Sequence, residues 1–157
     1  MERRIDLYEE LMREVESVLD GERDPITWMA SLSCLIKQKL GFFWVGFYRL
    51  VDGDLLIGPY QGTLGCIRIG LNKGVCGTAA AKQQTILVPD VHKFAGHIAC
   101  DARSESEIVV PVFDGERRLR AVLDVDSDRL DDFSPVDQHY LEQLVARMKD
   151  VEWTKAS

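Results

Sequence analysis

The segment 96–101 places a cysteine where its sulfur could react. It reads Gly-His-Ile-Ala-Cys-Asp, so Cys100 has small or flexible neighbours. Residues 90–106 have little periodicity and predict a long loop, which in a compact domain often serves function. A loop thiol is a candidate nucleophile, although an inert, half-buried cysteine fits the composition equally well. His97 could help to hold a thiolate, whereas Asp101 would oppose one if its carboxylate turned inward.

Two carboxylates, Asp124 and Asp126, are candidates for functional groups that act together with the cysteine. Asp124 and Asp126 lie two positions apart on a predicted strand, so their side chains project from the same face. Acids at a strand end usually meet water. Beside an apolar Val-Leu-Val run, however, carboxylates are costly to bury and tend to mark a site that binds cations or manages protons. Glu107, at the start of the preceding predicted strand, either joins them or is a plain surface residue.

The composition limits what such residues could act on. With 157 residues, 46% of them apolar and 29% charged, the chain is typical of a single globular domain, 1–157. Its net charge of -7 argues against nucleic acid and against anionic membranes as partners. The chain has no apolar run of the roughly 20 residues that a membrane-spanning helix needs, and it starts with a charged amphipathic pattern, so we expect a cytoplasmic protein.

The four cysteines are too few for a disulfide scaffold at this length, and none of them form a C-x-x-C pair. In a reducing compartment, the cysteines can then serve in buried packing, in metal binding or in catalysis. Cys34 lies among leucine and isoleucine residues of a predicted helix, where we expect a small buried hydrophobe.

Helical periodicity appears at both ends of the chain. Apolar residues recur at three- and four-residue steps over 5–19, which predicts an amphipathic helix. A second helix is expected between Asp24, which is placed to cap it, and Gly41, which can adopt the left-handed conformation that ends it. The segment 134–137, Ser-Pro-Val-Asp, predicts the start of a last helix with a capping box.

The middle of the chain has strand patterns, with turn signals at Asp52-Gly53 and Asp114-Gly115. The expected strands are residues 42–50, 55–57, 66–69, 84–88, 108–113 and 119–126. A glycine-rich entry predicts a short helix over 74–82. Hairpins enclosed by terminal helices argue for an α+β domain with a mostly antiparallel sheet that helices cover on one face.

Alternation along the first predicted strand assigns its side chains to two faces. Phe43, Val45 and Phe47 are expected on one face, and Trp44 and Tyr48 on the other. Both sets are apolar, so we expect both faces of the sheet to be covered. For Trp44 and Tyr48, the residues alone favour core packing.

Seven motifs, in order between about Leu7 and Val145, resemble the free methionine-R-sulfoxide reductases, which are stand-alone GAF domains. They are WVGFY (44–48), GPYQG (58–62), GVCGT (74–78), DVH (90–92), GHIACD (96–101), SEIVVP (106–111) and VLDVDS (122–127). Seven motifs in order are far more specific than any one of them. The GAF fold that the resemblance implies, a mostly antiparallel central sheet flanked by helices, agrees with the element pattern.

The resemblance implies roles for the cysteines and the aromatic residues. Cys100 matches the family's catalytic nucleophile, Cys66 its resolving cysteine and Cys76 an auxiliary third cysteine. Trp44 matches the aromatic residue that shelters the methylthio end of the substrate, and Tyr48 lies beside it on the same strand face.

The resemblance also implies a reaction. Glu107, Asp124 and Asp126 match the acidic cluster that binds substrate and supports protonation of the sulfoxide. The implied reaction reduces free L-methionine-(R)-sulfoxide to L-methionine through a cysteine sulfenic acid and an intramolecular disulfide, which thioredoxin reopens. Neither a metal nor an organic cofactor is implied, and the family suggests a homodimer.

Three other interpretations compete with this one. A non-catalytic GAF sensor of a small molecule would need a partner domain, and a cysteine redox switch would use Cys66 and Cys100 without any preference for sulfoxide. A zinc site built from Cys66, Cys76, Cys100 and either His92 or His97 would be irregularly spaced. The segment 62–65 and Arg120-Ala121 depart from the family's pattern, and neither is expected to touch a catalytic position.

Overall fold

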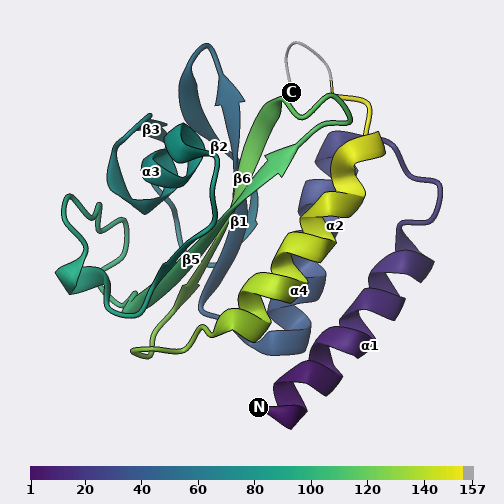
Figure 1. Ribbon diagram of the computed structural model, residues 1–157, viewed down its shortest axis with the longest axis horizontal. Helices are drawn as coiled ribbons and strands as arrows, with labels where there is room; N and C mark the ends of the chain where they lie inside the picture. Colours follow the sequence, from purple (N-terminus) through teal and green to yellow (C-terminus); the bar gives the residue numbers. More distant parts are fainter. Residues whose placement is uncertain (154–157) are drawn as a thin grey trace.

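A six-stranded sheet forms the centre of the computed structural model, which describes residues 1–153 (Figure 1). The strands follow the order β3-β2-β1-β6-β5-β4, and every neighbouring pair is antiparallel. They are β1 (Trp44–Val51), β2 (Asp54–Gln61), β3 (Arg68–Gly70), β4 (Ile86–Val88), β5 (Ser106–Phe113) and β6 (Leu119–Ser127). The predicted α+β class is confirmed. The last four residues of the predicted domain, 154–157, lie outside the described part.

Helices cover both faces of this sheet. α2 (Pro25–Leu40) packs against β1 and β2, α4 (Pro135–Ala146) packs against β5, and α1 (Glu2–Val18) lies outside these two helices (Figure 1). α3 (Gly74–Lys82) lies on the opposite face, against β5 and β6. Two short 3-10 helices are η1 (Val91–Lys93) and η2 (Arg147–Asp150). Within residues 1–153, no helix combines the length and the apolar character needed to cross a bilayer.

The expectation that helices cover only one face is therefore wrong. The small residues of α3 allow this helix to lie close to the sheet, and a side chain at Gly77 would collide with the carbonyl oxygen of Gly70. The periodicity of such a short, alanine-rich segment does not show which surface it covers. α3 thereby encloses the sheet face that carries Trp44 and Tyr48.

The sheet separates two apolar clusters. Val45 and Phe47 of β1 belong to the larger cluster under α1, α2 and α4, whereas Trp44 and Tyr48 belong to the smaller cluster on the α3 side. This division confirms the predicted alternation within β1. Phe43 is an exception: it packs with the smaller cluster, because it precedes the first residue of β1, where the strand alternation begins.

The helix ends form largely as their sequences predict. The side chain of Asp24 accepts a hydrogen bond from the Thr27 amide at 2.8 Å, and Gly41 ends α2 with a φ of 71°. Ser134 and Asp137 form the predicted capping box at the start of α4. Cys34 is half-buried on α2, so the expectation that it is a buried hydrophobe is wrong.

A fully buried carboxylate, Asp137, joins α1 to α4. It accepts hydrogen bonds from the Tyr8 hydroxyl and the Ser134 amide, both at 2.8 Å, and lies 3.3 Å from an Arg4 guanidinium nitrogen. We expect Asp137→Ala to lower the free energy of unfolding by about 3 kcal/mol, because it leaves the Tyr8 hydroxyl and the Ser134 amide without their acceptor and leaves Arg4 with Asp132 alone. Urea denaturation measures this loss. Tyr8→Phe removes one of these bonds and should cost about 1 kcal/mol; equal losses for the two variants would contradict the network.

Candidate active site

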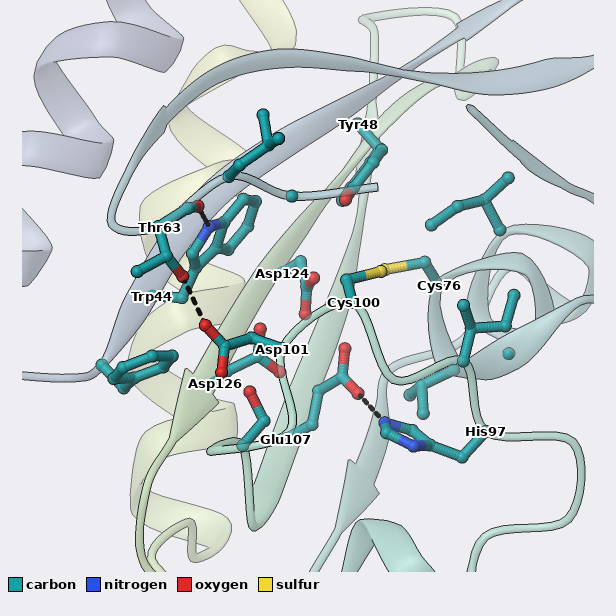
Figure 2. A pocket seen from close by; sticks show the side chains of 18 of the residues that line it. Trp44, Tyr48, Thr63, Cys76, His97, Cys100, Asp101, Glu107, Asp124 and Asp126 are labelled. Atoms are coloured by element: carbon teal, nitrogen blue, oxygen red, sulfur yellow. Dashed lines mark hydrogen bonds and ion pairs between the residues drawn. The ribbon is translucent and has the colours of Figure 1, made fainter. Parts of the chain in front are cut away.

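A pocket opens on the α3 side of the sheet and gathers the residues that the sequence singles out (Figure 2). Its floor is formed by side chains of β1, β5 and β6, and loops 62–65 and 97–104 form its rim. Seven of the eight predicted site residues line it: Trp44, Tyr48, Cys76, Cys100, Glu107, Asp124 and Asp126. The eighth, Cys66, is bonded to Cys100.

Strand register aligns the floor. Trp44 of β1 lies opposite Asp126 of β6, which lies opposite Glu107 of β5, so the three side chains form one row on one face. In the next row Gly46 lies opposite Asp124. A side chain at Gly46 would collide with the Trp44 ring, so the glycine leaves the space that the indole occupies.

The three carboxyl groups of the floor lie close together, Glu107 and Asp124 buried and Asp126 half-buried, and like charges in such a site disfavour ionisation. Burial, with a further contribution from the charge of Asp126, raises the pKa of Glu107 to about 8. Burial first and then a neighbouring acid raise the pKa values of Asp124 and Asp126 well above the usual range. The cluster therefore holds protons near neutral pH. Glu107 is not a plain surface residue.

Cys76 lies against this cluster from α3. Its sulfur and one oxygen each of Glu107 and Asp124 lie within 4.8 Å of one another, the only such donor group in residues 1–153 that could share a metal ion. Burial, and next the charge of Asp124, raise the pKa of the Cys76 thiol well above its usual value. A buried neutral thiol is a poor nucleophile.

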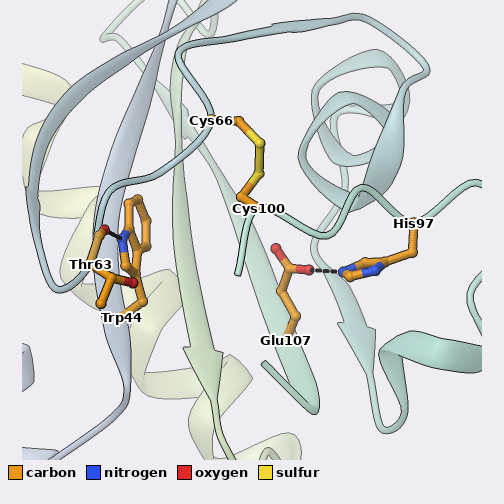
Figure 3. Close-up of a disulfide and its surroundings, with 6 residues drawn as sticks. All are labelled: Trp44, Thr63, Cys66, His97, Cys100 and Glu107. Atoms are coloured by element: carbon orange, nitrogen blue, oxygen red, sulfur yellow. Dashed lines mark hydrogen bonds and ion pairs between the residues drawn. A yellow bond between two sulfur atoms is a disulfide. The ribbon is translucent and has the colours of Figure 1, made fainter. Parts of the chain in front are cut away.

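A disulfide joins Cys66 to Cys100 at the pocket (Figure 3). Their Cα atoms are 5.4 Å apart, although 34 positions separate them in the sequence. Cys66 lies between β2 and β3, and Cys100 lies in the loop that precedes β5, where it is exposed to solvent. The pairing that the family resemblance implies is present. In this state two of the three sulfurs of the competing zinc site are joined to each other and are not metal ligands.

Thr63 ties the two rim loops together, a role that the sequence does not reveal. Its carbonyl oxygen accepts a hydrogen bond from the Trp44 indole at 2.7 Å, and its hydroxyl donates one to Asp101 at 2.8 Å (Figure 2). Asp101 is also paired with Arg103 at 2.8 Å, and the Arg103 guanidinium lies 5.0 Å from the centre of the Phe43 ring. Hydrogen bonds from Arg103 lower the pKa of Asp101 well below its usual value.

Segment 62–65, the first departure from the family's pattern, lies beside Trp44 and Tyr48, the aromatic residues of the site. Besides the Thr63 bonds, a side chain at Gly65 would crowd both the Trp44 and the Tyr48 rings. Gly62 has a φ of 136°, a conformation that favours glycine. The two glycines, three positions apart, are the signal in the sequence for this close approach. The other departure, Arg120, pairs with Asp114 at 2.9 Å, away from the pocket.

His97 contacts the acids. Its Nε2 lies 3.6 Å from a carboxylate oxygen of Glu107 (Figure 3). Burial lowers the pKa of His97, so the ring is mainly neutral at pH 7. A neutral ring provides no positive charge to stabilise a thiolate, and this contact instead assigns His97 to the carboxyl cluster.

Comparisons with known proteins agree with this geometry. Residues 33–150 match the family described as "GAF domain". The chain is 42% identical over 147 residues to the free methionine-R-sulfoxide reductase of Escherichia coli (strain K12), an alignment that covers 93% of this chain and 88% of that protein.

Two solved structures extend the likeness to three dimensions. Free methionine-R-sulfoxide reductase from Neisseria meningitidis, in complex with its substrate, superposes with a TM-score of 0.90 and 40% identity, over 93% of this chain and 88% of that one. The reduced form of the Staphylococcus aureus fRMsr gives a TM-score of 0.87 with 41% identity, over 90% of this chain and 92% of that one.

Proposed function

Since the chain belongs to the GAF-domain family and, within it, to the free methionine-R-sulfoxide reductases, we propose that its pocket reduces free L-methionine-(R)-sulfoxide to L-methionine. One observation carries the proposal: the Cys66–Cys100 disulfide lies at a pocket whose floor consists of proton-holding carboxyl groups. A sulfoxide oxygen leaves only when protonated, and its sulfur then needs a thiol nucleophile. The site offers both.

The aromatic residues supply the seat for the substrate's methylthio end. The ring centres of Trp44 and Tyr48 are 6.1 Å apart. The Tyr60 ring stacks on Trp44, with 5.1 Å between the two ring centres. Aromatic faces pack well against a thioether carbon and sulfur. With the sulfoxide held there, the ammonium group of a free amino acid pairs with Asp124 and Asp126, because its positive charge lowers their raised pKa values and favours their ionised forms on binding. A peptide-bound residue has no such ammonium group.

The proposed cycle has two steps on the protein. The Cys100 thiolate attacks the sulfoxide sulfur while a carboxyl group of the cluster protonates the oxygen; methionine leaves, and the oxygen remains on Cys100 as a sulfenic acid. The Cys66 thiol then attacks this sulfenic sulfur, water leaves, and the disulfide forms. Cys76 has an auxiliary role as a neutral thiol beside the acids. Thioredoxin in a reducing cytoplasm supplies the two electrons that restore both thiols.

The direct test supplies purified protein with thioredoxin, thioredoxin reductase and NADPH. We expect the R epimer of free methionine sulfoxide to cause NADPH consumption, with little or none for the S epimer or for the same residue inside a peptide. A protein that ignores the free R epimer but reduces peptide sulfoxide would overturn the proposal. The non-catalytic sensor predicts no consumption with any of the three.

Cys66→Ser should separate the two steps. The first turnover should remain, with one methionine released per protein, because the attacking sulfur is unchanged. Steady-state turnover with thioredoxin should fall on the order of 10²-fold, since a thiol positioned by the fold is replaced by one that must arrive from solution. Quenched-flow measurement of methionine and trapping of the sulfenic acid with dimedone check both. An unchanged steady-state rate would remove Cys66 from this role.

A further inference from the structure

Three large apolar side chains are exposed near the disulfide, in a chain of which 29% of the residues are charged. Leu64 and Ile67, close to Cys66 in the sequence, have 71% and 57% of their surfaces exposed, and Ile98, two positions before Cys100, has 39%. We call these three residues the disulfide rim. Single exposed apolar side chains are ordinary, but a group of them marks an interaction site.

The two loops that carry the disulfide rim meet at the disulfide itself. Leu64 and Ile98 both line the pocket that contains Cys100, and Ile67 is the chain neighbour of Cys66. The Thr63–Asp101 hydrogen bond joins the two loops independently of the disulfide. Ile98 also packs against Gly74, where α3 begins. The two loops therefore have contacts that do not depend on the disulfide.

The position of the disulfide indicates which kind of partner binds this surface. Only thiol exchange reopens it under the proposed cycle, and the attacking sulfur must approach from the solvent side, where Cys100 is exposed. A small thiol needs no apolar contact to do this. A protein that carries its dithiol on an apolar face gains binding energy from burying the rim as it places its sulfur.

We propose that Leu64, Ile67 and Ile98 form the docking surface for a dithiol protein reductant of the thioredoxin type, an inference that rests on the proposed function. One thiolate of the reductant attacks a disulfide sulfur, and the other sulfur leaves as a thiolate and takes a proton. The second thiol of the reductant then attacks the mixed disulfide. Two electrons pass to the protein: the reductant leaves as a disulfide, and Cys66 and Cys100 become thiols.

Ile67 is the residue to change, because it lies outside the pocket. For Ile67→Asp, we expect the KM for thioredoxin to rise about tenfold, since an apolar contact of about 1.4 kcal/mol is lost. The rate with dithiothreitol as the only reductant should stay unchanged, and Ile67→Leu should restore the wild-type KM. Ile26→Ser is the control: Ile26 is 62% exposed on α2, on the other side of the sheet, and its loss should alter neither rate.

A second measurement needs no sulfoxide. Oxidised protein is mixed with thioredoxin that lacks its second cysteine, and formation of the covalent mixed disulfide is followed by intact mass. Ile67→Asp should slow this reaction about tenfold. A KM for thioredoxin within twofold of wild type, or an equal fall in the rates with thioredoxin and dithiothreitol, would overturn the docking surface. Because wild-type turnover with dithiothreitol tests the proposed function separately, the two failures are distinguishable.

Discussion

Replacing Cys100 with serine is expected to abolish sulfoxide reduction, with the rate falling by about 10⁴-fold or more. A serine hydroxyl is not ionised near neutral pH and is a far weaker nucleophile than a thiolate, so it does not displace oxygen from a sulfoxide. The variant also has no sulfur on which the sulfenic acid can form. The first turnover should therefore vanish together with the steady state. Methionine released per protein in a single mixing experiment, with no added reductant, measures this.

Cys34→Ser is the matched control, because Cys34 is the half-buried free cysteine of α2, remote from the pocket residues. It should retain full activity. If Cys100→Ser still released one methionine per protein, the attacking sulfur would have to be Cys66 or Cys76. Burial among acids argues against Cys76, because the raised pKa keeps it a neutral thiol.

The parts of this site that follow local periodicity could be predicted from the sequence. Asp124 and Asp126 share a face because side chains along a strand alternate with a period of two. The Asp52-Gly53 turn fixes the first hairpin in the same way, with φ values of 51° and 84° that such a turn requires. Each of these features depends on residues within a few positions, so local patterns are sufficient.

The remaining features depend on contacts between distant segments, which no local pattern contains. Without the family resemblance, nothing in the spacing of Cys66 and Cys100 brings their Cα atoms to 5.4 Å. The Thr63–Asp101 bond likewise joins residues 38 positions apart. Arg103 could be read as an ordinary solvated charge until the fold places it over Phe43. The register between β5 and β6, rather than any motif, brings Glu107 beside Asp126.

That register has an energetic consequence for the proposed chemistry. Three carboxyl groups that share a buried site cannot all be charged, so the cluster must hold protons at a pH where isolated acids have lost them. The fold thus keeps an acid ready beside a disulfide that, once reduced, provides a nucleophile. A pair of groups held in opposite protonation states is the arrangement that general acid catalysis with a thiolate needs.

Glu107→Gln should test which carboxyl group provides the proton. We expect the single-turnover rate to fall by about 10²- to 10⁴-fold, the usual contribution of a positioned general acid, because an amide cannot give up a proton to the sulfoxide oxygen. The pH dependence of the wild-type rate shows whether the protonated or the ionised form of the group is active. The pKa of Glu107 is about 8, and the acid form is the active one, so the wild-type rate should decline as pH rises through about 8.

In Glu107→Gln this alkaline decline should be absent, and the residual rate should continue to rise with pH as the Cys100 thiol ionises. Single-turnover rates between pH 6 and 9.5, with pre-reduced protein, measure this separately from recycling. Glu105→Gln makes the same change two positions earlier, outside the pocket, and should leave both rate and profile intact. If the decline near pH 8 persisted in Glu107→Gln, the proton would have to come from Asp124 or Asp126, whose pKa values burial also raises.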